Sequence, residues 1–230
     1  MKKVKSPYFT YPRILSAGAR PEKDELLPQR LGGRALFLME FARMQGVFAP
    51  RPRLAVLEIA AGSGDYSRLI VDAARARKRA IRVTEVEFSK AAIDAARARS
   101  RDYPEIDFVL HSLAGLDELA PGGHDLAGCG VALHLFGIDQ AVAIIKAMDR
   151  SARGAWMAVD FRRSRWLTML AEAVVSWSSK NGQDPRQAVS LTQQAFTARE
   201  MKNLAFHAGI ADYEYRGWFL LHQTLIRIKR

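Results

Sequence analysis

LEIAAGSGDYS, residues 57–67, joins an apolar run to a glycine-rich turn and then to the start of a helix. Such a strand–turn–helix junction usually holds a nucleotide-like ligand, because backbone N–H groups at the turn and at the helix N-terminus face it. The ligand of this junction could be a dinucleotide, a nucleoside triphosphate or a nucleoside-like molecule without phosphate. The residues of the turn distinguish among the three.

The turn lacks the residues that the two phosphate-binding patterns require. A P-loop places a lysine directly after its last glycine, whereas Asp65 follows Gly64 here. A dinucleotide fingerprint needs a third glycine or an alanine at the position of Ser67. Glu58, at the end of the apolar run, would also repel a pyrophosphate. It suits a ligand that carries positive charge instead.

Downstream of Pro52, short apolar runs alternate with segments of helical periodicity. Strands are expected at 54–59, 81–86, 106–110, 126–133 and 154–160, and helices at 65–77, 89–99, 139–149 and 197–207. This alternation indicates βαβ units, and hence an α/β fold with a doubly wound, Rossmann-like sheet that is mostly parallel and has helices on both faces. Two strand-like runs about Gly217 predict an antiparallel C-terminal hairpin that closes one edge of the sheet.

Composition indicates one main domain of ordinary globular character. The 230 residues are 49% hydrophobic and 26% charged, which is enough for one sizeable core. Cys129 is the only cysteine, so no disulfide within the chain is possible and a reducing compartment is expected. No apolar stretch reaches the roughly 18 residues of a transmembrane helix, and residues 1–15 lack the apolar core of a signal peptide. We therefore expect a cytoplasmic protein.

The net charge of +11 permits an anionic partner such as a nucleic acid. However, most basic residues lie in alanine-rich helical segments such as DAARARKRA, residues 72–80. A solvated helix face explains such a segment more often than a binding surface does. No aromatic residues interleave with the basic ones, as a base-stacking surface requires. A nucleic-acid partner is therefore possible but not favoured.

Residues 58–64, EIAAGSG, resemble motif I of the class I S-adenosylmethionine-dependent methyltransferases, whose pattern is D/E-x-G-x-G-x-G. Glu58 corresponds to the acidic residue, and Gly62 and Gly64 correspond to the second and third glycines. Ala60 replaces the first glycine, which slightly restricts the backbone. The resemblance implies a methyltransferase whose cofactor, S-adenosyl-L-methionine, binds at this turn.

Three later positions correspond to cofactor-binding positions of the same family. Glu87 matches an acidic residue that accepts hydrogen bonds from both ribose hydroxyls, although strand alternation puts Glu85 on the same side as a rival. Phe88 matches the apolar position that lies against adenine. Ser112 stands where the family often has an aspartate for the adenine amino group, so it can accept a hydrogen bond but carries no charge.

The resemblance covers residues 54–165 and extends through 195–210, and it suggests how the chain is divided. We expect residues 1–50 to form a helical or irregular cap, and residues 51–230 to form the methyltransferase domain with a helical lid at 166–195. VDFRRSRW, AFTAREM and HAGI also resemble small methyltransferases found beside type III polyketide synthases. This finer resemblance implies a phenolic or polyketide-like acceptor that is methylated at an oxygen.

His134 is the predicted general base, because it follows the fourth strand and a histidine can take a hydroxyl proton at neutral pH. The alternative is a histidine that packs the pocket or caps the next helix. Arg162 and Arg163 are predicted to hold an acidic group of the substrate, or else to pair with nearby carboxylates. His207 and His222 are expected to be structural. The histidines lack the spacing of metal ligands, so no metal is expected.

The sequence leaves two other functions open. An RNA methyltransferase would account for the positive charge. A non-catalytic, cofactor-binding relative would account for Ala60 and Ser112, where the chain departs from the family pattern. The leading prediction is methyl transfer to a small molecule.

Overall fold

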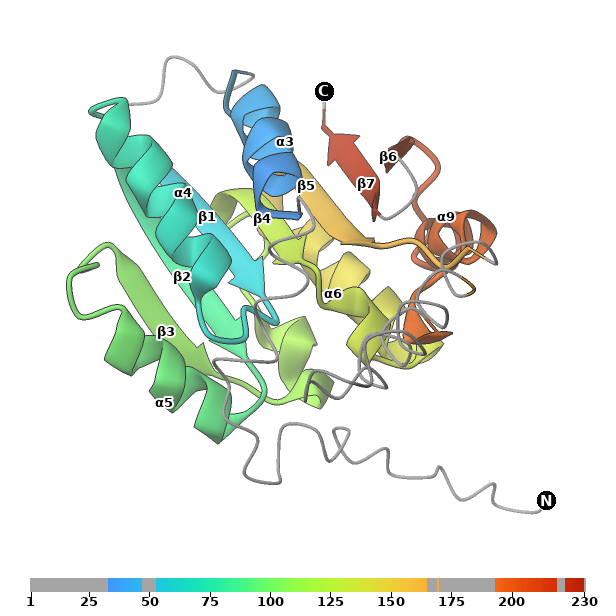
Figure 1. Ribbon diagram of the computed structural model, residues 1–230, viewed down its shortest axis with the longest axis horizontal. Helices are drawn as coiled ribbons and strands as arrows, with labels where there is room; N and C mark the ends of the chain where they lie inside the picture. The colour runs from blue at the N-terminus through green and yellow to red at the C-terminus, as the bar shows by residue number, and fades with distance from the viewer. Residues whose placement is uncertain (1–32, 47–52, 165–168, 170–192, 219–221, 230) are drawn as a thin grey trace.

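The computed structural model describes residues 33–46, 53–164, 169, 193–218 and 222–229 (Figure 1). Within the predicted cap, residues 1–50, the described part contains helix α3, Arg34–Gly46. Most of the predicted lid, residues 166–195, lies outside the described residues. The predicted domain boundaries therefore stay predictions.

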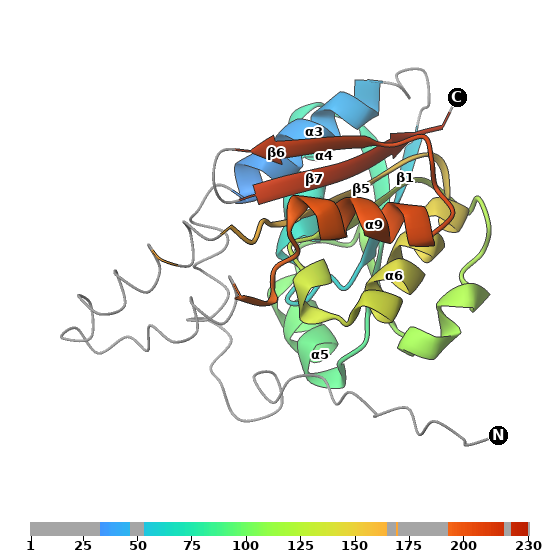
Figure 2. The same cartoon turned by 90° about the vertical axis from the view of Figure 1, so that its right-hand side faces the viewer.

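A seven-stranded sheet in the order β3-β2-β1-β4-β5-β7-β6 forms the centre of the molecule. Its strands are β1 Arg53–Ile59, β2 Ala80–Glu87, β3 Ile106–Leu110, β4 His124–Gly130, β5 Ala152–Phe161, β6 Glu214–Trp218 and β7 His222–Ile228. Strands β1 to β5 are parallel, β7 is antiparallel to β5, and β6 is antiparallel to β7. The predicted α/β, Rossmann-like sheet with its antiparallel C-terminal hairpin is confirmed (Figures 1 and 2).

The strand order reverses between β1 and β4. From β1 the chain continues outward through β2 and β3 on one side, and through β4 and β5 on the other. In open parallel sheets, ligands bind at such a reversal, beyond the carboxyl ends of the strands. The turn after β1 lies at this point.

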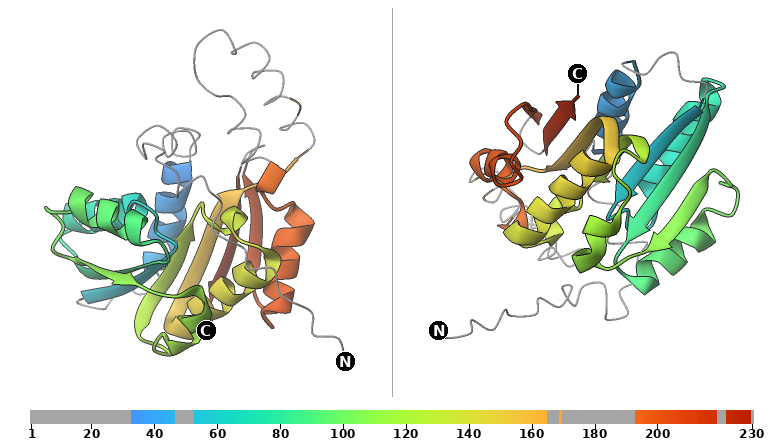
Figure 3. Two further views of the ribbon diagram at one scale, coloured as in Figure 1. Left: turned by 90° about the horizontal axis from the view of Figure 1, so that it is seen from below. Right: turned by 180° about the vertical axis from the view of Figure 1, so that it is seen from behind.

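Helices cover both faces of the sheet (Figure 3). Besides α3 they are α4 Asp65–Ala76, α5 Lys90–Arg99, α6 Ile138–Ser151 and α9 Ala198–His207. Phe37 of α3 and Ile70 of α4 belong to one apolar core layer, whereas Ile144 of α6 and Leu204 of α9 belong to the other. Helices α4, α6 and α9 are amphipathic, and each buries its apolar face, as its periodicity predicts. Among the described helices, none is long and apolar enough to span a bilayer.

Hydroxyl side chains cap the N-termini of two of the helices. Ser89 Oγ accepts a hydrogen bond from Ala92 N at 3.4 Å. Thr197 Oγ1 accepts one from Glu200 N at 3.2 Å, while Glu200 Oε2 accepts one from Thr197 N at 2.7 Å. This reciprocal pair is a capping box, which confirms the predicted start of α9. Gly209, with φ of +78°, follows the end of that helix.

Helix α3 joins the two halves of the sheet at one face. At its start, Arg34 Nη2 donates to Asp65 Oδ1 of α4 at 3.1 Å. Near its end, Arg43 Nη1 donates to Glu214 Oε2 of β6 at 3.0 Å. The first turn of α3 is therefore held beside the N-terminus of α4, close to the turn after β1.

Two details of the predicted strands are wrong. Strand β4 ends at Gly130 instead of continuing, because Val131 takes a φ of +52° and a short 3-10 turn, Leu133–Leu135, follows. Gly217 lies inside β6 rather than between the two strands of the hairpin. A side chain at Gly217 would lie 2.7 Å from Arg162 Nη1, so the glycine leaves room for that guanidinium.

Candidate active site

The turn after β1 combines three residues in the left-handed region of backbone conformation. Ala60, Gly62 and Gly64 have φ of +59°, +61° and +74°. A Cβ at Gly62 would meet no atom within 4 Å, whereas a Cβ at Gly64 would lie 2.7 Å from Glu85 Oε2. Gly62 therefore faces open space, where a ligand can approach the backbone, and Gly64 is needed for packing.

Ala60 takes the conformation that the family pattern assigns to a glycine. Its N–H donates to Val86 O at 2.9 Å, which joins the turn to the neighbouring strand β2. An alanine in the left-handed region costs about 1–2 kcal/mol, a strain that the surrounding turn must offset. The substitution changes the side chain but keeps the path of the backbone.

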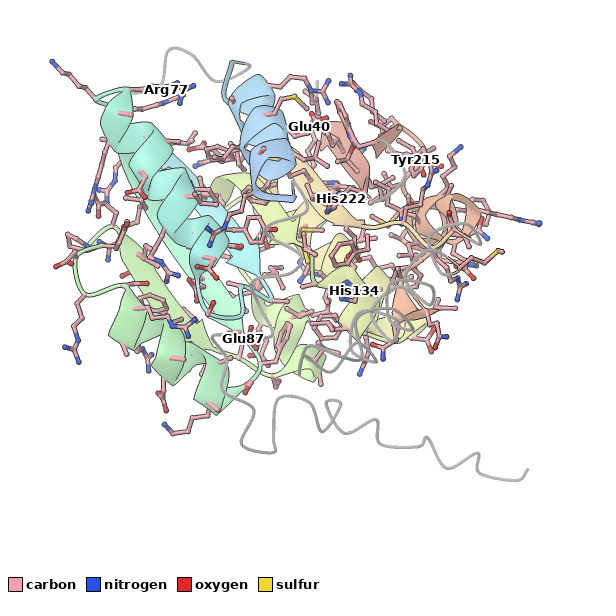
Figure 4. The ribbon with its side chains drawn as sticks, viewed as in Figure 1. Glu40, Arg77, Glu87, His134, Tyr215 and His222 are labelled. Atoms are coloured by element: carbon pink, nitrogen blue, oxygen red, sulfur yellow. The ribbon has the colours of Figure 1, made fainter. Side chains whose placement is uncertain are left out.

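Glu87, the last residue of β2, holds the turn from the side. Its carboxylate accepts hydrogen bonds from Gly62 N at 2.9 Å, Phe88 N at 2.7 Å and Ser89 N at 2.9 Å. Three backbone donors fix the orientation of this carboxylate, and it lies against the open glycine. Figure 4 shows Glu87 at the end of the sheet to which the parallel strands point.

Glu85 lies in a different environment from Glu87, although alternation puts both on one side of β2. It is in register with Glu58 on β1, and both side chains are fully buried. Ser67 donates its hydroxyl to Glu58 Oε2. Among the described residues, Glu58 Oε1 and both carboxyl oxygens of Glu85 have no hydrogen-bond partner. Glu87, and not Glu85, is the glutamate that contacts Gly62 at the open side of the turn.

Burial determines the protonation of this carboxyl pair. It raises the pKa of Glu58 well above its usual range, and the neighbouring Glu85 raises it further. Burial also raises the pKa of Glu85 to about 7. Two adjacent buried carboxyls cannot both ionise easily, because each charge disfavours the other. The pair therefore retains a proton close to neutral pH.

The two residues predicted to contact adenine, Phe88 and Ser112, lie in different surroundings. Phe88 and Phe136 form an edge-to-face pair with ring centroids 5.8 Å apart, beside the end of β2. Ser112 Oγ accepts a hydrogen bond from Gly115 N at 3.0 Å and so caps a 3-10 turn, Leu113–Glu118. Its hydroxyl proton is still available to a ligand. Both contacts stay predictions.

His134 and Asp160 form a buried pair at the ends of neighbouring strands. His134 Nδ1 lies 2.6 Å from Asp160 Oδ1, and His134 N donates to Asp160 Oδ2 at 2.7 Å. Phe161 N also donates to Oδ1, at 2.8 Å. Because a carboxylate only accepts hydrogen bonds, we assign a proton to Nδ1, which leaves a lone pair on Nε2. Among the described residues, Nε2 has no hydrogen-bond partner.

The predicted substrate-binding arginines have other partners. Arg163 Nη2 donates to both carboxylate oxygens of Glu200, at 2.6 and 2.7 Å, and Arg163 Nη1 donates to Gln193 O at 3.2 Å. The guanidinium of Arg162 lies against Gly217 of β6. The Arg163–Glu200 contact matches the alternative in which an arginine pairs with a nearby carboxylate. A role in substrate binding stays a prediction for both.

Two residues of this region were missed by sequence reasoning. Asp160 was not paired with His134, because 26 residues separate them and only the adjacency of β4 and β5 joins them. Tyr66, in the first turn of α4, packs its ring against Gly130, where a Cβ would lie 2.7 Å from the ring. Its buried hydroxyl has no hydrogen-bond partner among the described residues. In the sequence, only the glycine at position 130 indicates that contact.

Comparison with known proteins agrees with this geometry. Residues 56–154 match the sequence model of a family described as a methyltransferase domain. A search of curated proteins found no match. The chain is similar in structure to a plantazolicin methyltransferase solved with a triazolic desmethylPZN analog and SAH, at 12% identity and a TM-score of 0.64, covering 94% of both chains.

Two further solved structures are similar. One is the magnesium protoporphyrin IX methyltransferase from Synechocystis PCC 6803 with bound SAH, at 17% identity and a TM-score of 0.58, covering 87% of this chain and 85% of that chain. The other is an arsenic(III) S-adenosylmethionine methyltransferase from Chlamydomonas reinhardtii, at 19% identity and a TM-score of 0.52, covering 76% and 64%. At these identities the likeness shows the fold. The chain therefore has the fold of these methyltransferases, and its residues 56–154 match a methyltransferase domain in sequence.

Proposed function

We propose that the protein transfers a methyl group from S-adenosylmethionine to an oxygen of a small phenolic or polyketide-like molecule. The observation that carries this proposal is the His134–Asp160 pair, with Nδ1 and Oδ1 2.6 Å apart at the ligand-binding end of the sheet. The similar structures named above support a small molecule, because plantazolicin, magnesium protoporphyrin IX and arsenic(III) appear in their names. Cys129 is the only cysteine and is buried, in keeping with a cytoplasmic location.

The residues at the turn fit the cofactor. Gly62 leaves an open approach to the backbone, and the Glu87 carboxylate lies directly beside it. A carboxylate at this position is a hydrogen-bond acceptor of the kind that ribose hydroxyls require. When bound, the cofactor supplies an electrophilic methyl group on a sulfonium ion. We propose that it is held by these residues: Glu58, Ala60, Gly62, Gly64, Glu87, Phe88 and Ser112.

His134 is proposed to remove the acceptor proton. Its Nε2 lone pair accepts the hydroxyl proton, and the imidazolium that forms keeps its hydrogen bond to the Asp160 carboxylate. Asp160 acts as a positioning residue, because its two oxygens hold both the ring and the backbone N–H of His134. A base fixed in this way contributes about 10²–10⁴-fold to the rate.

The test uses labelled S-adenosylmethionine with a panel of phenols, and compares the wild type with His134→Gln and Asp160→Asn. We expect kcat to fall about 10²-fold or more for His134→Gln, while the Kd for SAH measured by calorimetry stays unchanged. Raising the pH should restore part of the rate, because the phenol then ionises without a base. His207→Gln, at an exposed position on α9, is the matched control. A His134→Gln variant with wild-type kcat at neutral pH would show that the pair is structural.

A further inference from the structure

His222 lies at the end of the sheet where the parallel strands terminate and where ligands bind, although it is far along the chain from the other site residues. It is the first residue of β7 and is in register with Phe161, the last residue of β5. Because β7 runs antiparallel to β5, its start lies where the parallel strands end. The hairpin therefore brings a second histidine to the same end of the sheet as His134.

Aromatic contacts connect the two histidines. The Phe161 ring lies 5.4 Å from the ring of His134 and 5.2 Å from the ring of His222, measured between centroids. Phe161 thus separates two imidazoles, one on each side of it. Figure 4 shows His134 and His222 in the half of the molecule formed by β5, β7 and α6.

One ring nitrogen of His222, Nε2, has no hydrogen-bond partner in the described part of the chain. The residue is 4% exposed, and its Nε2 is buried without a hydrogen bond. Buried polar side-chain atoms in native proteins nearly always have a partner. The next two residues of β7 obey this rule, since Gln223 Nε2 donates to Phe161 O at 2.8 Å and Thr224 Oγ1 accepts from Trp218 Nε1 at 3.2 Å. His222 departs from its neighbours in this respect, which points to a ligand.

The two histidines differ in whether a carboxylate holds the ring. Burial lowers the pKa of His222, and the nearby Asp160 opposes this shift. A neutral imidazole at neutral pH can either donate to a hydroxyl or accept from one. His134, in contrast, has its Nδ1 proton committed to Asp160. His222 is therefore suited to recognition, and His134 to proton removal.

We propose that His222 is a specificity-determining residue, whose Nε2 binds a second hydroxyl of the acceptor while the reacting hydroxyl faces His134. This inference rests on the proposed function, because it takes His134 as the site of the reacting oxygen. The acceptor would be an aromatic ring with two hydroxyl groups, placed alongside Phe161 so that it reaches both imidazoles. An acceptor with one hydroxyl would leave His222 without a partner.

The test measures binding and transfer separately. Phenol, catechol, resorcinol and hydroquinone are titrated by calorimetry into the protein saturated with SAH, and the same compounds are assayed with labelled S-adenosylmethionine. The three dihydric phenols differ only in the spacing of their hydroxyls. We expect at least one of them to bind more tightly than phenol.

Two variants separate hydrogen bonding from packing. His222→Phe removes the polar atom and keeps a ring beside Phe161, whereas His222→Gln keeps a hydrogen-bonding group. We expect His222→Phe to weaken binding of the preferred dihydric phenol about fivefold to a hundredfold, and to leave phenol binding unchanged. His222→Gln should restore part of the loss. His124→Phe is the matched control, because His124 is a partly buried histidine that begins β4, at the opposite end of the parallel strands.

The outcomes distinguish this inference from the proposed function. Equal affinity of the wild type and His222→Phe for every dihydric phenol would overturn the inference, as would an equal loss for phenol and the dihydric compounds, or no binding of any of the four compounds. Binding that depends on His222 without any methyl transfer would support the inference and refute transfer to the oxygen of these phenols. Circular dichroism and thermal unfolding of each variant check that the fold is intact.

Discussion

Replacing Glu85 with glutamine is expected to stabilise the protein at alkaline pH. Burial is the largest cause that raises the pKa of Glu85 from 4.5 to about 7; the nearby Ser67 hydroxyl opposes it and the charge of Glu87 adds to it. The folded state therefore binds this proton more tightly than the unfolded state does. The resulting stabilisation is complete below about pH 4.5 and is lost as the pH rises through about 7.

The size of the effect follows from the two pKa values. A change from 4.5 to about 7 corresponds to roughly 3 kcal/mol of unfolding free energy. Glutamine has nearly the same shape as glutamate but does not ionise. The variant therefore keeps the unfolding free energy that the wild type loses as the pH rises. Its amide can also donate to Glu58 Oε1, which has no partner among the described residues. The unfolding free energy of Glu85→Gln, relative to the wild type, should rise by roughly 3 kcal/mol between about pH 4.5 and pH 8.

Urea unfolding followed by circular dichroism at several pH values between about 4.5 and 8 measures this difference directly. Glu118→Gln, the same substitution at an exposed position, is the matched control. If the difference between Glu85→Gln and the wild type stays constant over this range, Glu85 does not hold a proton in the folded protein. The account of the buried carboxyl pair would then be wrong.

The remaining predictions concern the cofactor. Gly62→Val should leave the protein folded but abolish SAH binding in calorimetry, because the new side chain would project into the open space beside the turn; retained binding would contradict the assignment of the turn. Gly64→Ala should instead lower the unfolding free energy by about 1–3 kcal/mol, because its Cβ would lie 2.7 Å from Glu85 Oε2; urea unfolding tests this, and unchanged stability would argue against the packing. Glu87→Ala should weaken SAH binding at least about tenfold, since hydrogen bonds to a charged group contribute about 1.5–3 kcal/mol each; equal binding by Glu87→Ala and wild type would exclude Glu87 as a ribose ligand.

The fold could be predicted because the sequence expresses it through local patterns. Apolar runs of strand length alternate with helical segments, and this alternation alone indicates a parallel sheet with right-handed crossovers. The end of β4 could not be predicted, because Val131 adopts φ of +52°, which its β-branched side chain disfavours. The place of Gly217 inside β6 could not be predicted either. The contact that favours a glycine there is made by Arg162, from a distant part of the chain.

The candidate site was predictable only where it follows one continuous segment. The turn from Glu58 to Gly64 is such a segment. Its positive φ angles lie at the three positions where the family motif has glycines. The partnership of His134 with Asp160, and the place of His222 beside Phe161, depend on which strands are neighbours. Strand order is a property of the whole sheet, so these contacts required the structure.

The position of β7 between β5 and β6 has a consequence for the order in which the chain acquires its structure. During synthesis β6 emerges from the ribosome before β7, yet it can join the sheet only through β7. Until residue 228 has emerged, β5 presents an unpaired edge of buried strand residues, which is a surface that other chains can bind. A ribosome that stalls within the hairpin would therefore expose a sheet edge that invites aggregation, because β7 could not yet pair along the whole of β5.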